Sequence, residues 1–146
     1  MHAPPSLYLS LNELRALLRR SYEALYHHGY DFQVMARSSL WLEAHGLDGI
    51  GLILRSLQDL ETPCRDIKLT QVDPQRYVLN GQGRCLIPFV NASADLAIAA
   101  AQDSGFGQID ILHVFGRLNI FAALKKSARL NLYAAALWYD AKESRT

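Results

Sequence analysis

The sequence lacks the features that mark membrane, secreted and nucleic-acid-binding proteins. Its longest apolar stretch, residues 130–139, contains Asn131 and is too short to cross a bilayer. Residues 1–10 have no basic segment followed by an apolar one, as a secretory signal would. The 15 Lys and Arg residues nearly balance the 14 Asp and Glu residues, and no basic block stands out along the chain. We therefore expect a cytoplasmic protein that binds neither a membrane nor nucleic acid.

Cysteine is scarce as well. Cys64 and Cys85 have no metal-type spacing, and two cysteines do not make a disulfide framework. We expect both to be reduced and no metal site to be present. Arg65 would lower the pKa of the neighbouring Cys64 thiol, but no histidine lies near it in the sequence. A nucleophilic role for Cys64 therefore has little support.

What is present is a globular composition, with 50% hydrophobic and 20% charged residues in a chain of 146. That length is enough for one core and too short for two ordinary domains. We expect a single domain over residues 1–146. Within it, residues 10–62 form a helical layer and residues 63–140 an α/β part, with residues 1–9 and 141–146 flexible.

Three helices are predicted in the first part. Ser10 and Glu13 have the spacing of a capping box, Gly29 ends the first helix, and Asp31 and Asp48 begin the next two. Apolar residues recur at helical spacing in the first helix: Leu11, Leu14, Leu17, Leu18, Tyr22 and Leu25.

The pattern changes to alternating strands and helices after Pro63. The expected strands are residues 66–72, 76–80, 108–114 and 131–139, and the expected helices are residues 118–128 and a segment that runs from Asn91 or Ser93 to about Asp103. Residues 80–83 (Asn-Gly-Gln-Gly) are expected to form a turn rather than a phosphate-binding loop. The pattern predicts an α/β (α+β) fold, in which a three-helix layer packs on a small mixed β-sheet with βαβ crossovers.

Candidate catalytic groups are few. His45 and His113 each precede a loop, and Asp48 lies close to His45, so the three would form an acid/base site if the fold brought them together. Each is also explained by capping or by local hydrogen bonding. The adjacent His27 and His28 point in different directions on a helix and favour a helix-end role.

The order of four segments resembles the front part of the type-2 malate/L-lactate dehydrogenase superfamily of NAD(P)-dependent 2-hydroxy- and 2-imino-acid reductases. Residues 42–51 are similar to the end of that family's second helix and the following loop. Residues 77–83 are similar to a strand and turn, and residues 92–101 to the next helix. Residues 105–116 are similar to a glycine-led strand ending in Ser-Asn-His-Phe-Gly. A group of short bacterial proteins of unknown function looks similar too.

The resemblance also shows what is missing. In the family, the first loop carries a Ser-His pair that supplies the proton donor, and the later strand carries a histidine. Those positions correspond here to Gly49, Ile50 and Val114, which have no side chain able to transfer a proton. His113 stands one residue earlier, and a shift of one residue in a strand places a side chain on the opposite face. The family's later cofactor-binding segments have no counterpart.

We therefore expect a non-redox relative of these dehydrogenases that acts as a binding or partner subunit, with no cofactor of its own. NAD(P) would bind only if a partner chain completed the site. Two alternatives are a small lyase, isomerase or cyclase that acts on a small carboxylate through His45, Asp48 and His113, and one half of a split oxidoreductase. We expect association, as a homo-oligomer or with another chain, through an apolar strand at Leu130–Tyr139.

Overall fold

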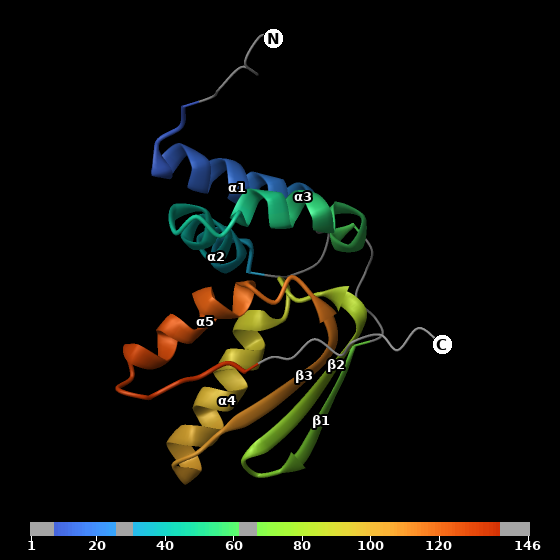
Figure 1. Cartoon of the computed structure of the whole chain (residues 1–146), viewed down its shortest axis with the longest axis vertical. Helices are drawn as coiled ribbons and strands as arrows, with labels where there is room; N and C mark the ends of the chain where they lie inside the picture. Colours follow the sequence, from blue (N-terminus) through green and yellow to red (C-terminus); the bar gives the residue numbers. More distant parts are fainter. Residues whose placement is uncertain (1–7, 26–30, 62–66, 138–146) are drawn as a thin grey trace.

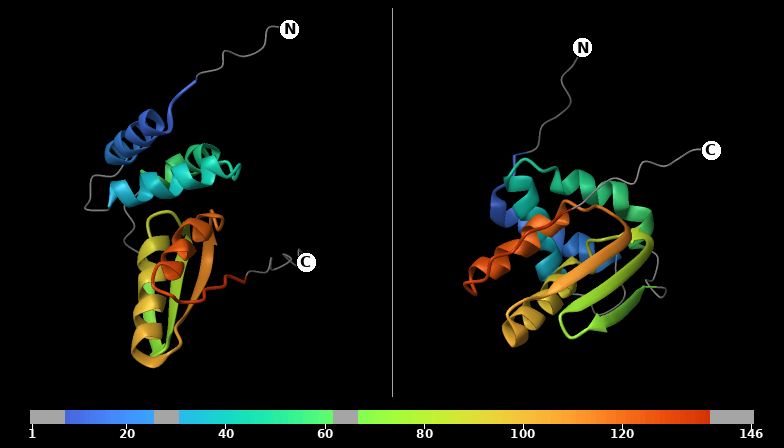
Figure 2. Two further views of the ribbon diagram at one scale, coloured as in Figure 1. Left: turned by 90° about the vertical axis from the view of Figure 1, so that its left-hand side faces the viewer. Right: turned by 60° about the horizontal axis from the view of Figure 1, so that its bottom comes forward.

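The computed structural model describes residues 8–25, 31–61 and 67–137 and has the predicted architecture, in which three helices lie on a small α/β unit (Figure 1). The elements in chain order are α1 (Leu11–Leu25), α2 (Phe32–Ala44), α3 (Gly49–Leu60), β1 (Lys68–Asp73), β2 (Arg76–Cys85), α4 (Val90–Ser104), β3 (Gln108–Phe115) and α5 (Asn119–Ala128). Two turned views show α1, α2 and α3 stacked at one end of the sheet and of its covering helices (Figure 2). The α/β class is therefore confirmed.

The helices of the layer begin where their capping residues predict. Before α1, the Ser10 amide donates to Glu13 Oε2 at 2.8 Å and the Glu13 amide donates to Ser10 Oγ at 3.3 Å. The hydrogen bonds from Ser10 lower the pKa of the Glu13 carboxyl. Asp31 accepts from the Val34 amide at 3.0 Å and caps α2. Gly29, expected to end the first helix, lies outside the described residues.

One hydrophobic core joins the helical layer to the sheet. Its buried residues are Leu18, Tyr22, Met35, Ala36, Ile53, Leu60, Cys85 and Ile87. Cys85 is the last residue of β2 and Ile87 follows it, so the carboxyl end of this strand is inserted among the helices. Tyr22 is fully buried, its hydroxyl lies 2.6 Å from Ser39 Oγ, and burial raises the pKa of that hydroxyl.

The sheet has the order β1-β2-β3, with β1 antiparallel and β3 parallel to β2. Leu79, in the central strand, faces Leu69 on one side and Ile111 on the other. Helix α4 connects the two parallel strands, and Gly105, at a φ of +80°, ends it. The expected start of α4 at Asn91 or Ser93 is wrong. The helix begins at Val90, because a tight turn after β2 leads directly into α4. In this turn the Val90 amide donates to Leu86 O at 3.0 Å.

Two further expectations are corrected. Residues 80–83 do not form a turn between elements but an irregularity within β2, where the pairing with β3 shifts register. The apolar strand expected at Leu130–Tyr139 is absent from residues 130–137, the part that the structure describes. Asn131 has a φ of +55° and the Leu132 amide donates to Ser127 O at 3.0 Å, so this segment first forms the end of α5. The chain beyond it then pairs with no described strand, and Tyr133 is fully exposed.

Candidate functional site

His45 lies in the turn between α2 and α3, where it ends α2. Its Nδ1 atom is 2.7 Å from Trp41 O, and its ring stacks on the Trp41 indole with 4.0 Å between centroids. A carbonyl oxygen only accepts hydrogen bonds, so Nδ1 carries the proton and donates. Lys125 of α5 lies over the same indole at 5.9 Å. The imidazole is thus held in a local stack at the joint between α2 and α5.

Asp48, three residues later, has both carboxylate oxygens engaged in starting α3. Oδ1 accepts from the Gly51 amide at 3.1 Å, and Oδ2 accepts from Arg55 Nη1 at 2.8 Å. The Asp48 backbone is left-handed, with a φ of +52°, a conformation that Asp tolerates better than most residues. Both members of the ion pair are about 60% exposed, so the pair contributes little to stability. Asp48 therefore acts as a helix cap, as its position in the sequence predicts.

His113 sits on another part of the molecule, near the end of β3. Its Nδ1 atom is 3.1 Å from Asn80 Oδ1, which also accepts from the Gln82 amide at 3.1 Å. His113 has a left-handed backbone with a φ of +52°. The register shift at residues 80–83 of β2 is therefore accompanied by an irregular backbone in β3. Within the described residues, no hydrogen bond joins His113 to His45 or Asp48. The structure thus gives each of the three candidate residues its own local partner.

Gly49, Ile50 and Val114, which the sequence resemblance matched with proton-handling residues, make packing or backbone contacts in this structure. A Cβ atom on Gly49 would lie 2.2 Å from Ser39 O and 3.0 Å from the Glu43 amide nitrogen, so α3 begins pressed against the backbone of α2. The next amide, of Ile50, donates to Glu43 Oε2 at 3.0 Å. Val114 packs against a second hydrophobic cluster, whose buried residues are Leu86, Val90, Ala94 and Ala123. It also contacts Gly81 so closely that a Cβ atom on Gly81 would lie 2.2 Å from Val114 Cγ1.

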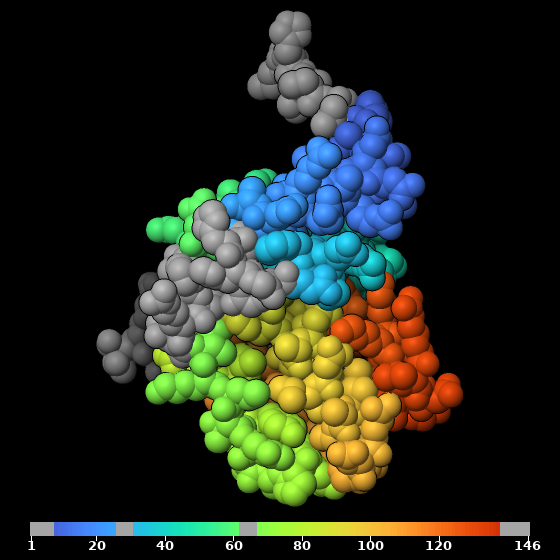
Figure 3. Space-filling view, turned by 180° about the vertical axis from the view of Figure 1, so that it is seen from behind, coloured from blue at the N-terminus to red at the C-terminus, as the bar shows by residue number. Residues whose placement is uncertain are grey.

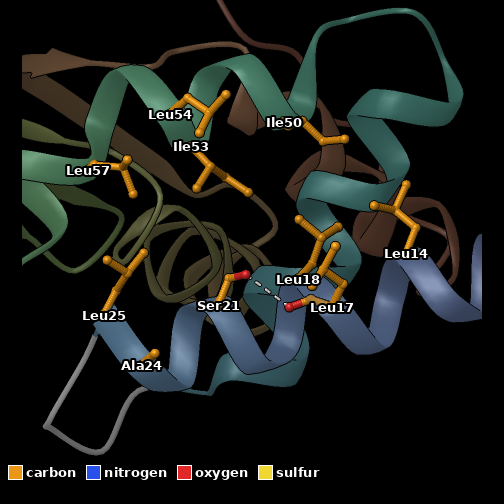
Figure 4. A pocket seen from close by; sticks show the side chains of 10 residues that line it. All are labelled: Leu14, Leu17, Leu18, Ser21, Ala24, Leu25, Ile50, Ile53, Leu54 and Leu57. Atoms are coloured by element: carbon orange, nitrogen blue, oxygen red, sulfur yellow. Dashed lines mark hydrogen bonds between the residues drawn. The ribbon is translucent and has the colours of Figure 1, made fainter. Parts of the chain in front are cut away.

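An open apolar groove of about 340 Å³ lies between α1 and α3 (Figure 4). Nine of its lining residues are apolar: Leu14, Leu17, Leu18, Ala24, Leu25, Ile50, Ile53, Leu54 and Leu57. The tenth is Ser21, whose hydroxyl donates to Leu17 O at 3.0 Å. The groove therefore offers a polar ligand no free side-chain donor. Leu17 and Leu54 remain 51% and 61% exposed on its two sides.

A second hollow, of about 320 Å³, lies between α1 and α2 and is lined by polar and charged residues. Arg15 and Arg19 come from α1 and Arg37 from α2, together with the amide side chains of Asn12 and Gln33. The sequence analysis missed this cluster. One signal was present, since Arg15 and Arg19 are four residues apart and so share a helix face. The contribution of α2 required the structure.

A buried polar junction fixes the end of β2 to α3. Asp59 accepts from the Cys85 amide at 2.7 Å and from Arg84 Nη1 at 3.1 Å. The fully buried Cys85 thiol donates to Ser56 Oγ at 3.3 Å. Cys85 thus has a structural role, whereas Cys64 lies outside the described residues.

The structure also bears on cofactors and ions. Residues 80–83 do not fit the phosphates of a dinucleotide, because they continue into Arg84 and Cys85 of β2 instead of opening a helix. Among the residues that the structure describes, no three His, Cys, Asp or Glu side chains are grouped to hold a metal ion. None of the described helices combines the length and the apolar character needed to cross a membrane.

Comparisons with known proteins give a likeness of fold only. No protein-family model matches the sequence, and no curated protein matches it. Among solved structures, malate dehydrogenase from Pyrococcus horikoshii OT3 superimposes with a TM-score of 0.63 and 14% sequence identity. The match covers 83% of this chain and 38% of the dehydrogenase chain. The chain thus shares the fold of part of a malate dehydrogenase and spans well under half of its length.

Proposed function

We propose that the chain is a non-redox binding subunit built on a malate-dehydrogenase-like fold. The observation that supports this most strongly is the packing at Gly49. The position that corresponds to a proton-handling side chain in the resembling family lies against Ser39 O, with no room even for a methyl group. Proton transfer by a positioned side chain typically contributes about 10²–10⁴-fold to a rate, so a chain without one is a poor oxidoreductase.

The acid/base alternative has weaker support. An acid/base site needs side chains that converge on a common substrate atom. His45 is bound to Trp41 O, Asp48 caps α3, and His113 bonds to Asn80. These contacts favour structural roles for all three residues. The split-oxidoreductase alternative retains one supporting observation, which is that the chain matches only 38% of the longer dehydrogenase.

Calorimetry with NADH and NADPH, combined with a 2-oxo acid reduction assay on the purified chain, tests the non-redox proposal. We expect neither saturable cofactor binding nor turnover. Cofactor oxidation that saturates with a 2-oxo acid would contradict the proposal. If the H45A and H113A variants lost a measured non-redox activity, and H45Q, whose amide can still donate to Trp41 O but cannot transfer a proton, lost it as well, the acid/base alternative would replace the non-redox proposal.

As the partner, we propose a second copy of the chain, bound face to face through the groove between α1 and α3. The groove offers a metabolite no free side-chain donor, but exposed leucines project beside it. In a two-fold interface, the leucines of each copy can insert into the groove of the other, so the same face can bind to itself. This surface replaces the strand at Leu130–Tyr139, which the described residues do not form.

Light scattering after size-exclusion chromatography tests the partner proposal. The L54K variant places a charge on the 61% exposed leucine beside the groove and is expected to yield monomers, whereas wild-type chains form dimers. The control is L69K, which alters a leucine that is 49% exposed on β1, far from the groove in sequence, and should leave the dimer intact. The interface would be excluded if the wild type stayed monomeric over a roughly 100-fold range of concentration, or if L54K and L69K lost the dimer to the same extent.

A further inference from the structure

The hollow between α1 and α2 gathers three guanidinium groups without a carboxylate in its lining. Arg15, Arg19 and Arg37 line it together with Asn12 and Gln33. Helices α1 and α2 lie next to each other on the face of the molecule seen in Figure 3. The lining residues come from both helices. The formal charge of its lining is therefore +3, in a chain whose formal net charge is only +1.

These arginines are not satisfied by acidic neighbours. The four ion pairs among the described residues join Asp48, Asp59, Asp95 and Asp110 to other cations. Arg37 Nη2 donates to Gln33 Oε1 at 3.3 Å, which aligns its guanidinium along α2 but does not neutralise it. Arg15 and Arg19 form no hydrogen bond or ion pair within the described residues. Glu23 follows Arg19 by one helical turn, yet lies outside the lining of the hollow and is not paired with it.

All three arginines are exposed, so a ligand can reach their guanidinium groups, and water and salt weaken the repulsion between them. Like charges four residues apart on a helix repel each other, and Arg37 adds a third charge from across the hollow. The guanidinium group is the side chain best suited to phosphate and carboxylate, because its planar fork donates two parallel hydrogen bonds to two oxygens. The amide groups of Asn12 and Gln33 supply further donors, and the buried Ala36 forms an apolar base.

We propose that this hollow binds a small oxyanion with two or more negative charges, held by Arg15, Arg19 and Arg37. Its volume, about 320 Å³, is at the lower end of the range for small-molecule sites and suits a phosphate ester or a compact polycarboxylate. The shared chemistry is a cluster of anionic oxygens spaced to meet three guanidinium forks. The site lies on the α2 side of α1, whereas the apolar groove lies on the α3 side, so one chain can use both.

Isothermal calorimetry at fixed ionic strength tests the site, with inorganic pyrophosphate and citrate as the two probes. We expect one of them to bind saturably at one site per chain, and the stronger probe identifies the phosphate or the carboxylate source. Each of the R15Q, R19Q and R37Q variants should weaken that binding about tenfold, as the loss of one charge-assisted contact implies. The matched control is R20Q, which removes the same charge from the next residue of α1, outside the lining of the hollow.

A second measurement separates binding from folding. Because the three charges repel, the variants should melt at the same temperature as the wild type or higher when no anion is present, while losing the rise in melting temperature that the probe produces. Failure of both probes to bind, or equal weakening by R20Q and the three hollow variants, would overturn the proposal. Neither result depends on the oligomeric state or on the redox assays, so the proposed function is tested separately.

Discussion

Replacing Gly49 with alanine tests the packing on which the non-redox proposal depends. The new Cβ would lie 2.2 Å from Ser39 O, 3.0 Å from the Glu43 nitrogen and 3.1 Å from Leu42 Cβ. Two of these atoms belong to the backbone of α2, which cannot rotate away as a side chain can. The G49A protein must therefore separate the start of α3 from α2, at the junction that buries Leu42 and Leu52.

The expected cost follows from two opposing effects. Overpacking of a well-packed core typically costs about 1–3 kcal/mol, and a contact at 2.2 Å with a carbonyl oxygen places this site at the upper end. Alanine in place of glycine regains about 0.4–1 kcal/mol by restricting the unfolded chain. We therefore expect G49A to lower the free energy of unfolding by about 2 kcal/mol, a large part of the roughly 5–15 kcal/mol that stabilises a typical domain.

Gly51 provides a matched control one position further along the first turn of α3. Its Cβ would also meet an atom at 2.2 Å, but that atom belongs to the Asp48 carboxylate, which can swing aside. G51A then loses the Asp48 cap, worth about 1 kcal/mol, and regains a similar amount in helix propensity. The net change in the free energy of unfolding should therefore lie within about 0.5 kcal/mol of zero.

Urea unfolding followed by tryptophan fluorescence measures both variants. With a typical slope of about 1–3 kcal/mol per molar urea, G49A should shift the midpoint downward by about 1 M. A G49A protein as stable as the wild type would show that α2 and α3 do not press together at this point. G49S should be destabilised at least as much as G49A. A G49S protein as stable as the wild type would show that a side chain able to donate a proton fits at this position.

The other predictions concern polar contacts. D48A should cost about 1 kcal/mol in urea unfolding through loss of the α3 cap, whereas D48N, which keeps an acceptor and tolerates the left-handed backbone, should cost less than half of that. D59A removes the acceptor of the Cys85 amide at a half-buried site and should cost about 2–3 kcal/mol, while D95A, which breaks an exposed pair, should cost under about 1 kcal/mol. Hydrogen bonds from Gln108, and next from Arg76, lower the pKa of the Asp110 carboxyl in the folded protein below its ordinary value of 3.8. The ionised carboxylate therefore stabilises the fold fully above pH 3.8, and this contribution is lost as the pH falls through the lowered pKa. D110N should therefore flatten the acid limb of a stability-against-pH curve, and an unchanged limb would contradict this assignment.

Local signals explain why the secondary structure was largely predictable. Ser10, Asp31 and Asp48 each cap a helix at the residue that the sequence indicates, because a capping hydrogen bond spans only three residues. The predictions failed where tertiary geometry prevailed over local preference. The chain enters α4 at Val90 without a side-chain cap because the turn after β2 leaves no room for a longer loop.

The strand predicted in the apolar segment after α5 was wrong for a related reason. Its composition favours a strand, but a strand requires a partner, and Asn131 closes the helix with a left-handed turn that leaves Tyr133 and Leu137 in solvent. Composition does not reveal whether a partner strand is within reach. That information lies in the pairing of the sheet, whose described strands end at β1 and β3.

The candidate sites divide in the same way. From the sequence alone came the α/β class, the helix caps and the absence of proton-handling side chains at Gly49, Ile50 and Val114, because these depend on residue type and short-range spacing. Only the tertiary structure showed that Gly49 lies against Ser39 O and that Arg37 joins Arg15 and Arg19 around one hollow. Both facts depend on how α2 packs against its neighbours, and packing between helices is set by contacts between residues far apart along the chain.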